Sequence, residues 1–213
     1  MKMKLTLIRH GQTQGNIERR FSGCRTDEPL TDAGRTALCA VGGSGGSGGI
    51  GEGSMVFVSP MIRARETAEI LFPGLEKTVI EDLKEMDFGM LEPHNHEELD
   101  GDPDYQAWID SGGLAEIPGG ESIASFSQRA MRGLAAAVRQ AASSASKEIY
   151  AVAHGGTIMA IMSSLTGRAY YDFMSDNGCG YTVELEVDDA GNIVAAGAYD
   201  RFCGGIRDGS CDR

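Results

Sequence analysis

Basic residues are scarce in this chain. It has 19 lysines and arginines against 31 aspartates and glutamates, which gives a formal net charge of −12 and a pI of about 4.7. Nucleic acids and anionic membranes are bound through basic surfaces, so the composition predicts neither nucleic acid nor membrane as a partner. The overall field would also repel an anionic substrate, which would need a pocket made positive by a few arginines.

Paired cysteines and long apolar runs are lacking as well. The five cysteines are widely spaced and no two form a CxxC pair, which argues against a disulfide framework and against a zinc knuckle. The apolar residues before Arg9 are too few for the hydrophobic core of a signal peptide, and runs such as Met55–Val58 are far shorter than a membrane span. These absences predict a soluble protein of the reducing cytoplasm.

Strand and helix patterns alternate along the chain. Short apolar runs, typical of strands, fall at residues 3–9, 55–58, 79–80, 147–153, 181–187 and 193–199. Longer helical patterns fall at residues 31–41, 62–72, 122–142 and 157–165. The last two strands flank a turn rich in Asp, Gly and Asn, which predicts a hairpin. The order predicts an α/β fold with three layers, α/β/α, and a mostly parallel sheet that has an antiparallel edge.

The length and composition indicate one domain with a single core, which we assign to residues 1–199. The low-complexity stretch 42–53 has the composition of a flexible linker, but the sequence before it is too short to hold a core of its own. We expect it to be an exposed connection within the domain or, in a functional interpretation, a lid. Residues 200–213, which include Cys203 and Cys211, are expected to form a flexible tail.

Two of the four histidines directly follow predicted strands. His10 stands in Arg9-His10-Gly11 after the first strand, His154 precedes two glycines after a later one, and the polar cluster 59–63 follows a third. The carboxyl ends of parallel strands meet at one edge of a sheet, so two histidines and two arginines are expected in one cleft. A single histidine at a strand end is more often structural. The glycine after each histidine lets the backbone approach an anion, and the joint occurrence favours a functional role.

Further motifs follow in a fixed order along the chain. They are Gln12-Thr13, Asn16, residues 20–23, residues 27–31 with Gly34, Ser59-Pro60 with residues 63–68, Glu85-Met-Asp-Phe-Gly89, residues 118–122 and residues 154–157. Together with Arg9-His10-Gly11 they cover nearly the whole chain, which resembles the histidine phosphatase superfamily in its phosphoglycerate-mutase-like branch. Each motif is weak alone, and their order carries the resemblance. Among the members, α-ribazole phosphatase and the broad-specificity bacterial phosphatases look closest.

The resemblance implies a mechanism. His10 is the expected nucleophile and would form a phosphohistidine through one ring nitrogen while a backbone carbonyl holds the other. Glu85 would protonate the leaving oxygen and then activate water, although without the resemblance it would be interpreted as one charge of an acidic surface cluster. His154 is also expected to be catalytic. The residues implied to bind the phosphoryl oxygens are Arg9, Asn16, Arg63 and His154. The superfamily uses no metal, so we expect no metal and no cofactor.

The lid region, about residues 86–121, is expected to select the substrate. The candidates for the substrate pocket are Phe21, Ser22, Gly23, Tyr105 and Trp108. An aromatic residue on an amphipathic helix is more often part of the core, and that alternative stays open. His94 and His96 form a His-x-His pair flanked by acidic residues, which we interpret as a polar part of the lid rather than as a metal site.

Three functions are compatible with this catalytic core. Mutases carry basic residues in the lid that hold the substrate carboxylate, whereas this chain has no lysine or arginine between Met86 and Gly119. This absence favours hydrolysis of a small-molecule phosphate monoester over phosphoglycerate-mutase-type phosphoryl transfer. The third alternative, a pseudo-enzyme that binds phosphate or a phosphoprotein without turnover, is disfavoured by the presence of both His10 and Glu85. We expect a small-molecule phosphate ester as the partner, and a monomer or homodimer.

Overall fold

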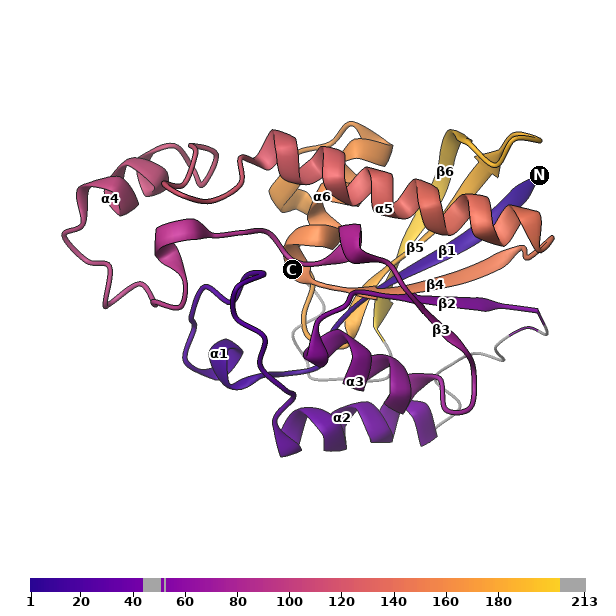
Figure 1. The fold of residues 1–213 in the computed structure, drawn as a ribbon, viewed down its shortest axis with the longest axis horizontal. Coiled ribbons are helices and arrows are strands. Elements are labelled where there is room, and N and C mark those ends of the chain that lie inside the picture. The colour runs from indigo at the N-terminus through magenta and orange to yellow at the C-terminus, as the bar shows by residue number, and fades with distance from the viewer. Residues whose placement is uncertain (44–50, 52, 204–213) are drawn as a thin grey trace.

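A six-stranded sheet forms the centre of residues 1–43, 51 and 53–203, which the computed structural model describes (Figure 1). The strands are β1 (Lys2–Arg9), β2 (Met55–Val58), β3 (Lys77–Val79), β4 (Glu148–Ala153), β5 (Cys179–Val187) and β6 (Ile193–Cys203). Their order across the sheet is β3-β2-β4-β1-β5-β6. The first four strands are parallel, whereas β5 is antiparallel to β1 and β6 is antiparallel to β5. The predicted sheet with an antiparallel edge is confirmed.

Helices cover both faces of this sheet. The α-helices are α1 (Gln14–Ile17), α2 (Asp32–Gly43), α3 (Ile62–Leu71), α4 (Pro103–Asp110), α5 (Ile123–Ser143) and α6 (Gly155–Thr166). The short 3-10 helices are η1 (Glu81–Leu83), η2 (Gly89–Leu91) and η3 (Tyr170–Phe173). Figure 1 shows α5 and α6 on one face and α2 and α3 on the other. The three-layer α/β/α class predicted from the sequence is therefore the fold observed.

The apolar run at the N-terminus follows from the position of β1. This strand pairs with β4 on one side and with β5 on the other, so neither edge meets solvent. Leu5 and Leu7 are 0% exposed and Ile8 is 1% exposed. A strand covered on both faces needs apolar side chains pointing both ways, which gives a nearly continuous rather than an alternating pattern.

Two boundaries differ from the prediction. The apolar pair at 79–80 predicts a strand there, but β3 covers Lys77–Val79, because backbone pairing with β2 sets its register and apolar content does not. The predicted start of the tail at residue 200 is wrong, because β6 continues to Cys203, which pairs with Cys179 of β5. The rest of the predicted tail, residues 204–213, and most of the glycine-rich stretch, residues 44–50 and 52, lie outside the described residues.

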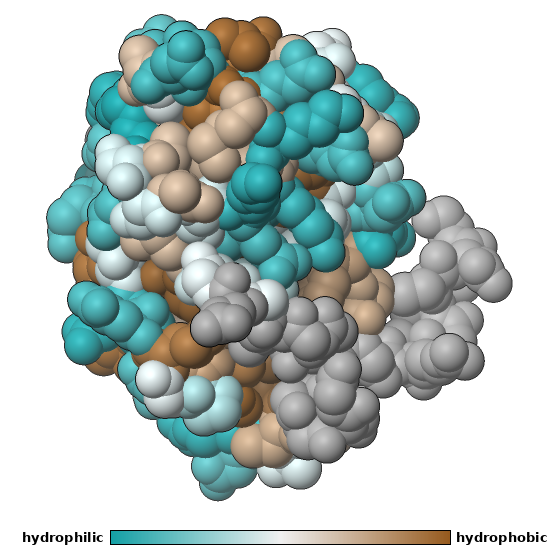
Figure 2. Space-filling model, turned by 90° about the vertical axis from the view of Figure 1, so that its right-hand side faces the viewer, coloured by the Kyte–Doolittle hydropathy of each residue, from teal (hydrophilic) through white to brown (hydrophobic). Residues whose placement is uncertain are grey.

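The carboxyl ends of the parallel strands point to the end of the molecule where α1 and α4 lie (Figure 1). Figure 2 views the opposite end, near the N-terminus, where hydrophilic side chains are spread over the surface and hydrophobic ones form smaller groups between them. Among the described residues, no helix has both the length and the apolar composition needed to cross a bilayer.

Candidate active site

His10 directly follows β1 and is 4% exposed. Its Nδ1 lies 2.7 Å from the carbonyl oxygen of Gly11. Because a carbonyl oxygen only accepts, Nδ1 carries the proton and Nε2 keeps a free lone pair. Burial, together with the charges of Arg63 and Arg9, holds the pKa of His10 well below its ordinary value. The site therefore contains a neutral imidazole with one nucleophilic nitrogen.

Arg9 is the last residue of β1 and contributes a positive charge beside His10. One terminal N–H of its guanidinium donates to the carbonyl of Ser175 at 2.6 Å. Its Nε is buried and has no hydrogen-bond partner among the described residues. A Cβ placed on Gly155 would lie 3.5 Å from this Nε, so the free N–H lies against the start of α6. Burial lowers the pKa of Arg9, yet an arginine stays charged, and a buried unpaired N–H at a helix N-terminus suits an anion.

Ser59, Arg63 and His154 form a network in which all three residues are 0% exposed. The Nε of Arg63 donates to Nδ1 of His154 at 3.2 Å. The proton of the neutral ring is therefore on Nε2, which donates to Ser59 Oγ at 2.7 Å. Burial and the charge of Arg63 hold the pKa of His154 well below its ordinary value. The ring centroids of His154 and His10 are 5.2 Å apart, so His154 packs beside His10 with both of its own nitrogens engaged.

The guanidinium of Arg63 also organises the loop that carries three predicted pocket residues. One terminal nitrogen donates to the carbonyl of Thr26 at 2.6 Å, and the other lies 3.1 Å from the carbonyl of Ser22 and 3.2 Å from that of Gly23. Burial lowers the pKa of Arg63, and nearby carboxylates, Glu85 first among them, oppose this shift. Arg63 therefore brings a charge next to His10 and at the same time fixes the loop around the site.

Asn16 forms a reciprocal cap at the start of α1. Its backbone N–H donates to Thr13 Oγ1 at 3.3 Å, and its Oδ1 accepts from the Thr13 N–H at 3.1 Å. The same Oδ1 accepts from Nδ2 of Asn177 at 3.0 Å. Because its side-chain oxygen already accepts two hydrogen bonds, the amide of Asn16 has its N–H groups left for a ligand. Phosphoryl oxygens are acceptors and require such donors.

Glu85 is 6% exposed and lies between η1 and η2. One carboxylate oxygen accepts from the Met86 N–H and the other from the Gly156 N–H, both at 2.9 Å. Burial raises the pKa of Glu85 above its ordinary value, although these N–H donors, Arg63 and Arg9 act in the opposite direction. A Cβ on Gly156 would lie 2.5 Å from Glu85 Oε1, so glycine at the start of α6 leaves the space that the carboxyl group occupies.

Arg129 of α5 holds the backbone around Glu85. Its terminal nitrogens donate to the carbonyls of Asp82 at 3.0 Å, Lys84 at 2.9 Å and Glu85 at 3.0 Å. It also pairs with Glu121, at 2.8 Å through Nε and at 2.6 Å through a terminal nitrogen. Arg129 was not among the predicted site residues. An arginine on the apolar face of a helix nevertheless indicates that a buried anion or a set of backbone carbonyls lies within its reach.

Four aromatic rings pack together, three of them from the predicted lid region and one, Phe21, from outside it. The ring centroid of Phe21 is 5.5 Å from that of Trp108, 5.8 Å from that of Phe88 and 6.1 Å from that of Tyr105. Tyr105 is 5% exposed and its hydroxyl group is 2.8 Å from Nδ1 of His96, so it supports the lid from within. Phe21 and Trp108 remain partly exposed. The Oγ of Ser22 is buried without a hydrogen-bond partner among the described residues.

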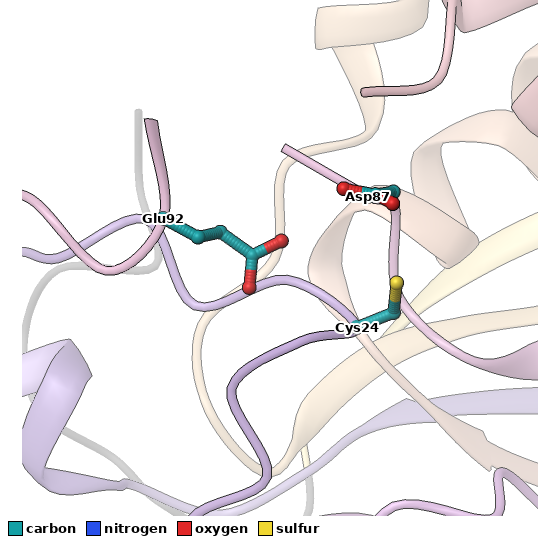
Figure 3. Close-up of side chains that lie close together, drawn as sticks. All are labelled: Cys24, Asp87 and Glu92. Atoms are coloured by element: carbon teal, nitrogen blue, oxygen red, sulfur yellow. The ribbon is translucent and has the colours of Figure 1, made fainter. Parts of the chain in front are cut away.

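Cys24, Asp87 and Glu92 form a compact group whose ligand atoms lie within 4.8 Å of one another (Figure 3). Arg25 lies 2.8 Å from Asp87, and Glu92 accepts from the N–H groups of Phe88 at 2.9 Å and of Arg25 at 3.2 Å. Burial and the two carboxylates raise the pKa of the Cys24 thiol, which disfavours the thiolate that a metal ion would need. The group thus joins two loops. His94 and His96 do not belong to it.

The five residues given central roles by the sequence are brought together. The charges of Arg9 and Arg63 act on His10, on His154 and on Glu85, and the two histidine rings are neighbours. Sequence analysis assigned no site role to Ser59, Arg129 or Asn177. The first had a signal, since it stands in the Ser-Pro motif after β2. Asn177 had none, because it lies in a short turn without periodicity.

Comparison with known proteins identifies the family of this chain. The family model of the histidine phosphatase superfamily (branch 1) matches residues 5–195. The adenosylcobalamin/α-ribazole phosphatase of Escherichia coli K12 is 30% identical over 197 residues, which cover 86% of this chain and 90% of that protein. The probable phosphoglycerate mutase GpmB of Klebsiella pneumoniae (strain ATCC 700721 / MGH 78578) is 31% identical over 175 residues, covering 79% of this chain and 77% of that protein.

A solved structure extends the comparison to the fold. Phosphoserine phosphatase from Entamoeba histolytica, in complex with 3-phosphoglyceric acid, superposes with a TM-score of 0.72 and is 30% identical, covering 93% of this chain and 96% of that chain. The region matched by the family model includes Arg9, His10, Arg63 and Glu85. The chain belongs to the histidine phosphatase superfamily, branch 1, and it is a phosphatase with the phosphoglycerate-mutase-like fold.

Proposed function

We propose that this chain hydrolyses a small-molecule phosphate monoester without a metal ion, through a phosphohistidine on His10 and with Glu85 as the proton donor. The observation that carries the proposal is the state of His10. Its Nδ1–H is held by the Gly11 carbonyl at 2.7 Å, and its lowered pKa keeps the Nε2 lone pair free. A neutral imidazole beside two guanidinium groups is a nucleophile placed next to an anion site.

In the first step, Nε2 of His10 attacks phosphorus in line with the leaving group. The P–N bond forms as the P–O bond to the leaving group breaks. Arg9, Arg63 and the N–H groups of Asn16 stabilise the charge on the phosphoryl oxygens. Burial raises the pKa of Glu85, which favours the protonated carboxyl group, and in this step its proton passes to the leaving oxygen.

In the second step, the Glu85 carboxylate accepts a proton from water as the water oxygen attacks phosphorus. The P–N bond breaks, and its electron pair returns to Nε2 of His10. The products are the alcohol and inorganic phosphate, and the acid and nucleophile regain their starting states. The hydrogen bonds from Met86 and Gly156 keep the carboxylate in one position through both steps.

The lid supports a leaving group that carries little negative charge. Residues 87–118 contain no lysine or arginine, and Phe21 and Trp108, whose ring centroids are 5.5 Å apart, offer partly exposed ring surface in this part of the molecule. A carboxylate or a second phosphate on the leaving group would find no cation in this part of the chain. The α-ribazole and phosphoserine phosphatases similar to this chain make their named substrates the first candidates to assay.

A panel of phosphate monoesters tests the proposal. It includes p-nitrophenyl phosphate, α-ribazole 5′-phosphate, phosphoserine and 3-phosphoglycerate, assayed with and without EDTA. We expect metal-independent release of phosphate, complete loss in His10→Ala, and little change in His94→Ala, whose side chain is exposed in the lid. Full turnover by His10→Ala, or activity that EDTA removes, would contradict the proposal.

The second candidate is mutase-type phosphoryl transfer, which the similarity to a probable phosphoglycerate mutase favours. A mutase must protect the phosphohistidine from water and hold the carboxylate of its substrate. Incubation of 3-phosphoglycerate with a bisphosphoglycerate primer distinguishes the two functions. Formation of 2-phosphoglycerate at a rate above phosphate release would support the mutase, and phosphate release alone supports the phosphatase.

A further inference from the structure

The turn that precedes β5, residues 175–178, contacts the nucleophile loop, which is the segment 9–11 that carries His10. The N–H of Gly178 donates to the carbonyl of Arg9 at 3.0 Å and approaches that of His10 at 3.3 Å, while the carbonyl of Ser175 accepts from the Arg9 side chain. Between them, Nδ2 of Asn177 lies 3.0 Å from the His10 carbonyl oxygen and 3.3 Å from that of Gly11. This turn and the nucleophile loop are therefore joined through both backbone and side chain.

The third contact of Asn177 reaches the phosphate side of the site. Its Nδ2 donates to Oδ1 of Asn16 at 3.0 Å. All three atoms around this nitrogen are oxygens, so the orientation of the Asn177 amide is determined by its surroundings. Asn177 is only partly exposed, and its amide stands between the backbone of His10 and the side chain of Asn16, to which the proposed function assigns the phosphoryl oxygens.

We propose that Asn177 is a positioning residue for phosphoryl transfer, because it fixes both the orientation of the Asn16 amide and the Gly11 carbonyl that holds His10. The inference rests on the proposed function, since it concerns how the same site presents its groups. Asn177 itself does not touch the substrate in this role.

The effect on Asn16 follows from hydrogen-bond polarity. Two donors, the Thr13 N–H and Asn177 Nδ2, meet Oδ1 of Asn16, and this pair keeps the Asn16 N–H groups toward the phosphoryl group. An aspartate at position 177 would instead put a carboxylate against three oxygens. The Asn16 amide would then turn its N–H groups to that carboxylate and its oxygen to the substrate, which reverses its effect.

The effect on His10 follows from the shared acceptor. The Gly11 carbonyl oxygen receives both Nδ1–H of His10 and Nδ2–H of Asn177. The direction of this carbonyl sets the plane of the imidazole ring and so the line along which Nε2 points at phosphorus. An amide that anchors the carbonyl thus keeps the nucleophile aligned, and its loss lowers kcat more than it raises KM.

The test compares Asn177→Asp with Asn177→Ala by p-nitrophenyl phosphate hydrolysis across pH, with unfolding temperature recorded for each variant. Asn192→Asp, in the exposed turn between β5 and β6, is the matched control and should retain activity. We expect kcat to fall about 10-fold in Asn177→Ala and on the order of 10²-fold in Asn177→Asp, the scale of one misplaced transition-state donor. Activity of the aspartate variant should recover as pH falls, because a protonated carboxyl group again offers a donor, whereas the alanine variant should show no such recovery.

If Asn177→Asp does not fold, the effect of Asn177→Ala can be measured in the Asn16→Asp variant and compared with its effect in the wild-type protein. In Asn16→Asp, the carboxylate still accepts from Thr13 and Asn177 but has no amide orientation to fix. Asn177→Ala should therefore cost only about 2- to 3-fold in that background, against about 10-fold in the wild-type protein. Equal costs in both backgrounds, or equal and pH-independent losses in the two Asn177 variants, would overturn the inference. A wild-type protein without turnover would instead contradict the proposed function.

Discussion

At the scale of single residues, burial moves the pKa values of His10 and Glu85 in opposite directions. Burial, with Arg63 and Arg9, lowers the pKa of His10, whereas burial raises the pKa of Glu85. Both shifts increase the fraction of molecules that hold a neutral histidine together with a protonated glutamate, which is the combination that the first step of the proposed phosphoryl transfer uses.

The pH dependence of kcat/KM follows from these two directions. Activity should fall on the acid side as His10 takes up a proton, and on the alkaline side as pH rises through the raised pKa of Glu85 and its proton is lost. In Glu85→Gln the alkaline limb should disappear, and esters with poor leaving groups should slow by about 10²- to 10⁴-fold, more than activated aryl esters. Glu81→Gln, exposed in the same segment, is the control. A loss of equal size for all leaving groups would speak against an acid role.

The residues that sequence analysis identified differ in kind from those it missed. Arg9, His10, Arg63, Glu85 and His154 stand in motifs that can be recognised along the chain. Arg129 and Asn177 act through carbonyl groups of distant segments, Glu85 in one case and Gly11 in the other. Backbone acceptors leave no mark in a sequence, so only the packing of α5 on η1 and of β5 on β1 brings these donors into place.

At the scale of elements, caps and apolar faces predicted the four helices with the longest patterns, α2, α3, α5 and α6, whereas the short α1 and α4 were given no range. The helix expected at 122–142 is α5 at Ile123–Ser143, and its Ser122 side chain accepts from the Ser125 N–H at 3.2 Å. A hydroxyl at an N-cap satisfies a free N–H, which is why such residues mark helix starts. The short edge strand β3 was displaced, because three residues of sequence hold too little periodicity to fix a register that pairing with β2 decides.

The hydrogen bonds of Arg129 connect α5 to the segment that carries Glu85, and they lead to a prediction about both stability and activity. Arg129→Lys keeps the charge but loses the planar fork that reaches Glu121 and three carbonyls. We expect a loss of roughly 2–3 kcal/mol in the free energy of unfolding, measured by urea titration, together with slower turnover of esters with poor leaving groups. Arg132→Lys, exposed on the same helix and 3.4 Å from Asp82, should change the stability little. Equal losses of stability and turnover in the two variants would contradict the role of Arg129 in holding the segment that carries Glu85.

At the scale of the whole molecule, a net charge of −12 surrounds a site built to bind an anion. The local cations are Arg9, half-buried at the carboxyl end of β1, and Arg63, buried in the first turn of α3, while the rest of the surface repels anions at long range. Because the cations are local and the overall charge is negative, phosphate binding depends on short-range contacts. It also disfavours substrates that carry charge beyond the reacting phosphate.

Ionic strength should therefore discriminate between substrates. Raising it from about 0.01 M to about 0.15 M shortens the Debye length from about 30 Å to about 8 Å and screens the repulsion. The ratio of kcat/KM for 3-phosphoglycerate to that for p-nitrophenyl phosphate should rise, because the more anionic substrate gains more from screening. Steady-state kinetics in a series of chloride concentrations measures this ratio. A ratio that falls with salt would indicate a cationic lid that residues 87–118 do not supply.

Trapping the covalent intermediate tests the central claim most directly. Rapid quench of the protein with labelled p-nitrophenyl phosphate should give an acid-labile, base-stable phosphoryl group, which peptide mass spectrometry maps to His10. Phosphorus NMR should assign it to Nε2, since Nδ1 is engaged with the Gly11 carbonyl. No label during turnover, a label on another residue, or phosphorylation of Nδ1 would contradict the account.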